Sequence, residues 1–229
     1  MTQEDFTTWT ETGVVARLSQ TADRSTFTNL ARTDDNTLLY INKAGQLQNF
    51  TYYFKFRLTS IFNDPKTIRL QPLSILEDKQ GYRTLQLAIK DQFGIQIRST
   101  NSTTIFQFVL YEARDTTNAW FVYGTMDKTV NTDYYVKLTK SGTALNVKIY
   151  DDPEFTNEIE SLNRTLTVNY NLPYLACPQS VDMATDIPMS GYMENLRDSL
   201  VDPGSADLNA EFTVRGEASG NLKAIFGLY

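Results

Sequence analysis

The residues best suited to binding chemistry are aromatic rings that lie close together in the sequence, with an acid and an amide between them. They are Trp120, Tyr123, Asp127, Asn131 and Tyr135. A sugar ring presents C–H groups that pack on aromatic faces, and its hydroxyls bond to amides and carboxylates. This combination predicts a carbohydrate-binding site. The alternative is that the rings belong to the core and surface of a tyrosine-rich β protein.

Catalysis is restricted by what the chain lacks. It contains no histidine, which excludes Ser-His-Asp and Cys-His nucleophiles, a histidine base and His-ligated zinc. Glycine-rich phosphate motifs and the G-x-S-x-G nucleophile motif are also absent from the sequence. The one cysteine, Cys177, has no cationic neighbours in the sequence, so a buried thiol is favoured over a reactive one. We therefore predict that the protein is not an enzyme.

The composition favours one large globular domain. The chain has 229 residues, of which 41% are hydrophobic and 12% aromatic, and its formal net charge is −6. This charge disfavours nucleic acid and anionic membranes as partners. The N-terminal residues do not read as a signal peptide, and no run is long enough to span a membrane. We expect cytoplasmic synthesis, with a virion-associated or extracellular location after lysis.

Alternating sequence predicts that β-strands position these residues. In 133–152, two alternating runs flank a Lys-Ser-Gly-Thr turn, which predicts a β-hairpin. Its expected core-facing side chains are Tyr134, Val136, Leu138, Leu145, Val147 and Ile149. A clear run at 50–58 places five large apolar side chains on one face. Other expected strands include 14–18, 26–30, 85–89, 105–111, 118–123, 165–170, 190–196, 211–215 and 222–228.

Two phrases carry a resemblance to a known family. Residues 140–151 read K-S-G-T-A-L-N-V-K-I-Y-D, and residues 191–196 read G-Y-M-E-N-L. Together they resemble the laminin-G-like, or concanavalin A-like lectin–glucanase, jelly-roll superfamily. There, a "K-x-G-x-x-L-x-V-x-x-Y-D" hairpin precedes a "G-x-x-x-N-L" strand. The resemblance implies an all-β, two-sheet antiparallel β-sandwich, with residues 1–229 forming a single LamG-like jelly-roll domain.

The resemblance also implies a metal that the chain could bind, although no cofactor is required. Relatives with this fold often hold calcium at the rim of the sandwich with Asp, Asn and carbonyl oxygens. By residue type the candidates are Asp34, Asp35, Asp151 and Asp152, together with Asn36 and Asp127. The alternative is that these residues build turns, for which loops commonly use Asp and Asn.

Glucanases of the same superfamily carry paired carboxylates on one strand, in the pattern E-x-D-x-x-E. The nearest match here is Glu158-Ile159-Glu160, which lacks the central aspartate and the third carboxylate. We therefore favour a solvated acidic face over a glycosidase pair.

Three functions follow from these observations. The first is a non-enzymatic recognition module of the laminin-G-like type, whose partner is a glycan or a protein surface. The second is a structural component of a virus or phage particle, such as a decoration or tail-associated protein that contacts other virion proteins. The third is a glycosidase. A fold of this kind hosts all three, so the choice depends on the site.

Overall fold

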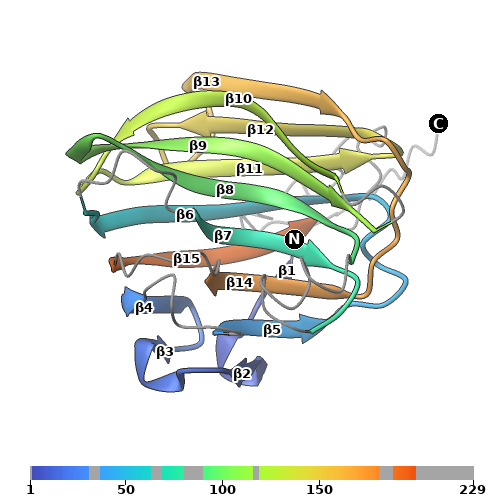
Figure 1. The fold of residues 1–229 in the computed structure, drawn as a ribbon, viewed down its shortest axis with the longest axis horizontal. Helices are drawn as coiled ribbons and strands as arrows, with labels where there is room; N and C mark the ends of the chain where they lie inside the picture. The colour runs from blue at the N-terminus through green and yellow to red at the C-terminus, as the bar shows by residue number, and fades with distance from the viewer. Residues whose placement is uncertain are drawn as a thin grey trace, which may run out of the picture.

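The computed structural model describes residues 2–30, 37–62, 69–79, 90–115, 119–180 and 188–199, and most of these residues lie in β-strands. The strands form two antiparallel sheets, which lie one in front of the other in Figure 1. This arrangement confirms the predicted all-β, two-sheet antiparallel β-sandwich of jelly-roll type. No helix in these ranges has the length and apolar character that a membrane span needs.

Within the described residues, one sheet has eight strands in the order β13–β12–β11–β6–β15–β4–β3, with β1 paired to β15. Their bounds are β1 (Thr2–Gln3), β3 (Leu18–Gln20), β4 (Arg24–Leu30), β6 (Phe50–Ser60), β11 (Tyr134–Ser141), β12 (Ala144–Tyr150), β13 (Glu158–Thr165) and β15 (Met189–Ser199). The long strands β6 and β15 are neighbours in this sheet, far from each other in the sequence (Figure 1).

The other sheet has seven strands over the same described ranges, in the order β10–β9–β8–β7–β14–β5–β2. Their bounds are β2 (Thr10–Thr12), β5 (Leu38–Asn42), β7 (Arg69–Leu76), β8 (Gln92–Thr100), β9 (Ser102–Arg114), β10 (Ala119–Thr129) and β14 (Tyr174–Ser180). Two 3₁₀-helices, η1 (Phe6–Thr8) and η2 (Val15–Arg17), lie near the N-terminus.

Aromatic side chains fill the space between the sheets. On β6 the alternate residues from Phe50 to Leu58 are all at most 1% exposed, as the sequence pattern predicts. The ring of Phe56 packs against that of Phe108 on β9, with centroids 5.4 Å apart. The opposite side of β6 carries polar and tyrosine side chains, so this strand presents a second, different surface to the outside.

The predicted hairpin is confirmed in register and orientation. Strands β11 and β12 pair antiparallel, with Val136 opposite Ile149 and Lys137 opposite Lys148. All six side chains predicted to face the core are buried. The alternate side chains of β11 and β12 therefore project from the outer face of the eight-stranded sheet.

The second recognised phrase has a steric explanation. A Cβ atom on Gly191 would lie 2.4 Å from the carbonyl oxygen of Arg57 and 2.7 Å from the ring of Phe27. Asn195 adopts a left-handed φ of 53°, where β15 changes its register, and Leu196 is fully buried. The phrase therefore marks a strand that lies unusually close to its neighbour and then bulges.

Several predicted strands differ from the structure. Residues 15–17 form the helix η2 instead of a strand, and the strand β3 begins only at Leu18. Residues 166–173 form a connection between β13 and β14, whereas we predicted a strand at 165–170. The strand predicted at 118–123 continues through a bulge to Thr129. The predicted strands at 85–89, 211–215 and 222–228 lie outside the described residues.

The connection at 166–173 is shaped by one buried carboxylate. Glu112 on β9 accepts hydrogen bonds from the backbone N–H of Thr167 at 2.9 Å and from the hydroxyl of Tyr170 at 2.8 Å. These bonds satisfy the carboxylate and hold this segment out of a strand ladder.

Cys177 on β14 is fully buried, as predicted, and this burial raises the pKa of its thiol.

Candidate ligand-binding site on the outer face of the eight-stranded sheet

The predicted site residue Tyr123 takes part in packing inside the protein. Its hydroxyl donates to Oε2 of Glu112 at 3.2 Å, and the guanidinium carbon of Arg164 lies 3.7 Å from its ring centroid. Partial burial, followed by the nearby Glu112 carboxylate, raises the pKa of Tyr123, although Arg164 opposes this shift. Both the ring and the hydroxyl are therefore used by the protein's own side chains.

The other predicted site residues lie in separate places. Asp127 is exposed on β10 and accepts a hydrogen bond from Nε2 of Gln107 at 2.8 Å. Asn131 lies in the turn before β11, with a left-handed φ of 61°. Tyr135 is half-buried on β11. Trp120 belongs to β10, but its side chain lies outside the described structure. The described side chains of this set therefore do not meet at one point.

The residues named for calcium are divided in a similar way. Asp34, Asp35 and Asn36 lie outside the described residues. Asp151 and Asp152 are described, and both accept hydrogen bonds from Asn157. In the ranges that the structure covers, no three acidic or cysteine side chains converge as a metal site. Calcium binding stays a prediction.

The two carboxylates that we compared with a glycosidase pair have different lysine partners. Glu158 bonds to Nζ of Lys148 at 2.5 Å, which holds the pKa of Glu158 below its ordinary value. Glu160 bonds to Lys128 on β10 of the other sheet. Each carboxylate therefore pairs with a lysine of its own, whereas we predicted a solvated acidic face.

A hollow of about 480 Å³ lies on the outer face of the eight-stranded sheet. Its lining includes Tyr53, Lys137, Tyr150, Glu154, Phe155 and Arg197. The centroid of the Phe155 ring lies 5.0 Å from that of Tyr53 and 5.4 Å from that of Tyr150, and both pairs meet edge to face. The hollow therefore has aromatic walls and a charged rim.

Of the described side chains predicted to bind a ligand, Tyr135 lies next to this hollow. It is directly opposite Lys55 on β6 and Tyr150 on β12. Its ring centroid lies 6.0 Å from that of Phe155. The rings of Tyr53, Tyr135 and Tyr150 thus surround Phe155 from three neighbouring strands, β6, β11 and β12.

The loop that carries Phe155 is fixed by an aspartate. Asp152 accepts hydrogen bonds from the backbone N–H of Thr156 at 3.1 Å and of Asn157 at 2.6 Å. Desolvation opposes the effect, but these bonds together hold the pKa of Asp152 below its ordinary value. Phe155 adopts a left-handed φ of 58°, which is rare for a large side chain. The loop therefore directs an aromatic ring back over the sheet.

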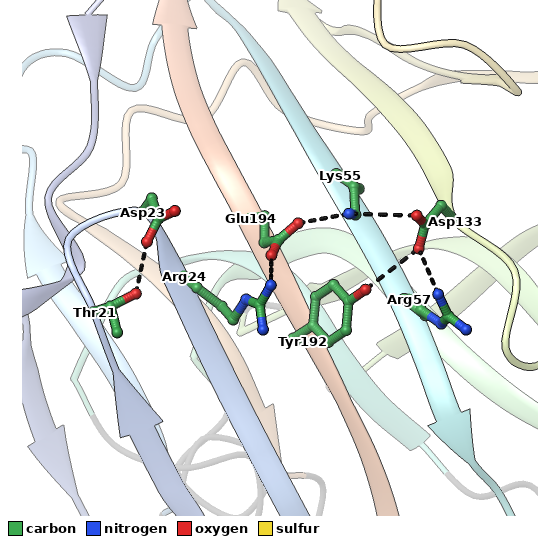
Figure 2. Close-up of polar contacts among 8 residues, drawn as sticks. All are labelled: Thr21, Asp23, Arg24, Lys55, Arg57, Asp133, Tyr192 and Glu194. Atoms are coloured by element: carbon green, nitrogen blue, oxygen red, sulfur yellow. Dashed lines mark hydrogen bonds and ion pairs between the residues drawn. The ribbon is translucent and has the colours of Figure 1, made fainter.

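A row of alternating charges lies beside the hollow and crosses β4, β15 and β6 to the residue before β11. In order, it contains Arg24, Glu194, Lys55, Asp133 and Arg57. Figure 2 shows Glu194 between Arg24 and Lys55, and Asp133 between Lys55 and Arg57. Nζ of Lys55 lies 2.7 Å from Glu194 and 3.3 Å from Asp133. Each of the two carboxylates pairs with two of the three cations, so every charged side chain in the row has an oppositely charged partner.

Tyr192 fits into the same row. Its hydroxyl donates to Oδ1 of Asp133 at 3.4 Å, and the guanidinium carbon of Arg24 lies 4.5 Å from its ring centroid (Figure 2). At the outer edge, Oδ1 of Asp23 accepts a hydrogen bond from Thr21 at 2.7 Å in the turn before β4. This end of the face is therefore a closed network, whereas the other end is hollowed.

The sequence carries signals for the hollow at residues other than most of those predicted to bind a ligand. The alternation of β6 and of the hairpin placed Tyr53, Tyr135 and Tyr150 on outward faces. Pairing of β11 with β6 would have brought these rings together. Phe155 is a lone aromatic residue in a polar loop, which is a recognisable sign of exposure or of a special contact. Arg197 had no local signal.

Comparisons with known proteins locate the fold among solved structures. No protein-family model matches the sequence, and no curated protein matches it. A functionally unknown protein from Saccharomyces cerevisiae superposes over 85% of this chain and 97% of its own, with 10% identity and a TM-score of 0.54. The exoplasmic/lumenal domain of VIP36, in a Ca2+/Man3GlcNAc-bound form, superposes over 87% of this chain and 88% of its own, with 12% identity and a TM-score of 0.50.

At these identities the likeness shows the fold alone, a two-sheet β-sandwich. This is the fold that the resemblance drawn from the hairpin and from the phrase at 191–196 implies. The narrower laminin-G-like assignment, and its extent over residues 1–229 as one domain, stay predictions.

Proposed function

We propose that this protein is a non-enzymatic recognition module that binds carbohydrate in the hollow on the outer face of the eight-stranded sheet. The observation that carries the proposal is the group of rings formed by Tyr53, Tyr150 and Phe155 beside polar and charged side chains. Sugar rings pack their C–H groups on aromatic walls, and polar groups at the rim fix their orientation. The lectin-like fold is compatible with this role but does not define the ligand.

The rings differ from ordinary surface aromatics because the backbone is arranged to hold them. Phe155 occupies a left-handed conformation that an asparagine or glycine would adopt more readily. Such a strained backbone position is commonly associated with a functional site. The hydrogen bonds that Asp152 accepts from the backbone N–H groups of Thr156 and Asn157 fix the loop directly after this residue.

Affinity electrophoresis and a glycan array, each run with and without calcium, test the proposal. We expect the protein to bind at least one polysaccharide, and Phe155→Asn to abolish this binding. Asparagine tolerates the left-handed backbone, so the variant removes the ring without disturbing the loop. Phe62→Asn is the matched control because Phe62 is an aromatic side chain that is 61% exposed and is not part of the hollow.

Two results would contradict the proposal. One is a wild-type protein that binds no glycan under either condition. The other is a Phe155→Asn variant that binds as tightly as the Phe62→Asn control. Thermal melts of both variants verify that the loss of binding does not come from unfolding.

A further inference from the structure

The outer face of the eight-stranded sheet carries cations of two kinds. Four of them form ion pairs with carboxylates: Arg24, Lys55, Arg57 and Lys148. The other two, Lys137 and Arg197, form neither an ion pair nor a side-chain hydrogen bond with any described residue. The Nε atom of Arg197 is buried and has no hydrogen-bond partner in the described structure. The Nε–H group of Arg197 has therefore lost its hydrogen bond to water without forming one to the protein.

The two unpaired cations flank the same ring. Tyr53 on β6 lies directly opposite Lys137 on β11 and directly opposite Arg197 on β15. Nζ of Lys137 lies 5.2 Å from the centroid of the Tyr53 ring, and both cations line the hollow. A ligand packed on Tyr53 would therefore have a positive charge on each side.

We propose that the ligand of this hollow is an acidic sugar, a uronic acid unit of a polysaccharide, with its carboxylate bound by Arg197 and Lys137. This inference rests on the proposed carbohydrate-binding function. The planar guanidinium of Arg197 matches the two oxygens of a carboxylate, and Lys137 adds a second, more flexible donor. The sugar ring packs against Tyr53 and Phe155.

The rim favours a carboxylate over a phosphate. Glu154 is an exposed lining residue on the same loop as Phe155. Its carboxylate accepts hydrogen bonds from sugar hydroxyls, but it repels a doubly charged phosphate group. The formal net charge of −6 repels any polyanion at long range, and this repulsion grows with the charge that each sugar unit carries. Recognition is thus limited to one anionic group per site, with hydroxyls around it.

The test compares ligands that differ only in this charge. The probes are polygalacturonate and polymannuronate, each beside its methyl-esterified form, with dextran sulfate as a sulfated polyanion. Binding is measured by isothermal titration calorimetry on the full chain. We expect at least one uronate polymer to bind, and its ester to bind roughly tenfold or more weakly, because a hydrogen bond to a charged group is lost. Dextran sulfate should bind more weakly than the uronate.

Single substitutions show which cation binds the carboxylate of the uronate. Arg197→Gln should weaken uronate binding by roughly tenfold or more, and Lys137→Gln should weaken it by a smaller factor. Lys148→Gln is the matched control, since Lys148 lies opposite Lys137 on the same face but already pairs with Glu158. The control should retain the wild-type affinity. Because Arg197 has no side-chain partner to lose, its variant should melt at the wild-type temperature.

The outcomes separate this inference from the proposed function. One possible outcome is that neutral polysaccharides bind, that Phe155→Asn abolishes this binding, and that Arg197→Gln leaves it unchanged. In that case the proposed carbohydrate binding is correct and the acidic-sugar assignment is wrong. Equal binding of uronate and its ester, or stronger binding of dextran sulfate, also overturns the assignment. If no glycan of any kind binds, both proposals are wrong.

Discussion

The ring of Phe155 meets the ring of Tyr53 at 80°, with centroids 5.0 Å apart, although Phe155 belongs to a polar loop and Tyr53 to the middle of a strand. This contact joins the loop between β12 and β13 to β6, a strand that is not adjacent to either in the sheet. The loop is therefore part of the outer face and not merely a connection between two strands.

The first prediction concerns the aspartate that holds this loop. Asp152→Ala removes the acceptor for the N–H groups of Thr156 and Asn157, whereas Asp152→Asn retains a side-chain oxygen that can accept from one of them. We expect the two amides to exchange with solvent faster in Asp152→Ala than in the wild type. Their exchange rates in Asp152→Asn should lie between those of the wild type and of Asp152→Ala. Hydrogen exchange by NMR measures this directly.

The same loop should respond to acid. The pKa of Asp152 is lowered in the folded state, so its contribution to stability is present above its ordinary value and is lost as pH falls through the folded value. The protection factors of the Thr156 and Asn157 amides, which correct for the slower intrinsic exchange of amides in acid, should fall in that acidic range. An unchanged protection pattern down to full protonation would show that other contacts hold the loop.

The second prediction concerns the close approach of β15 to β6. Gly191→Ala places a Cβ 2.4 Å from the carbonyl oxygen of Arg57, and this atom belongs to the backbone and cannot move aside alone. We expect the free energy of unfolding to fall by about 3 kcal/mol, at the upper end of overpacking costs. Urea denaturation measures the change.

A turn glycine provides the control for this substitution. Gly142, in the hairpin turn, has a left-handed φ of 57° and nothing within 4 Å of an added Cβ. Gly142→Asn should cost only about 0.5 kcal/mol, because asparagine tolerates this conformation. Equal stability of Gly191→Ala and Gly142→Asn would contradict the prediction. It would mean that β15 and β6 can move apart at Gly191 at little cost.

The third prediction concerns a buried lysine between the sheets. Nζ of Lys140 donates to the carbonyl oxygen of Gln48 at 2.5 Å and to Oδ1 of Asn169 at 3.0 Å, with no carboxylate bound to it in the described residues. Burial lowers the pKa of Lys140 from 10.5 to about 8. The unfolded chain therefore binds more protons than the folded protein between these two values.

Stability should consequently rise with pH between about 8 and the ordinary value of a free lysine, since the folded protein no longer has to bury the charge. Lys140→Met should remove this rise. The melting temperature of the wild type minus that of Lys140→Met should therefore increase with pH over that range. Taking the difference cancels the effect of buried tyrosines such as Tyr52, whose pKa is raised by burial. A constant difference would contradict the lowered pKa.

The elements that the sequence predicts correctly are strands in which apolar and polar residues alternate over several positions. The register of β11 and β12, the core face of β6 and the strand at 190–196 all follow from alternation of apolar and polar residues. The segment at 165–170 also has apolar residues at regular positions. It fails as a strand because Glu112, far away in the sequence, bonds to Thr167 and Tyr170.

The candidate site was less predictable because it depends on three-dimensional neighbours. Our choice of Trp120, Tyr123 and Tyr135 relied on closeness in the sequence, whereas β10 and β11 belong to different sheets. The hollow joins β6, β11, β12, β15 and a loop, and the missing partner of the Arg197 Nε atom becomes apparent only once its surroundings are known. The alternative role as a virus or phage component stays a prediction.

The Asx-type bonding of the loop at 151–157 also affects the thermodynamics of binding. A loop that is ordered only by its ligand must lose conformational entropy at that moment, which lowers affinity. Here Asp152 already fixes Thr156 and Asn157, and the rings of Tyr53 and Tyr150 already hold Phe155. The receptor side is thus preorganised, so the entropic cost of complex formation falls mainly on the flexible glycan, and shorter or stiffer chains should bind with the smaller penalty.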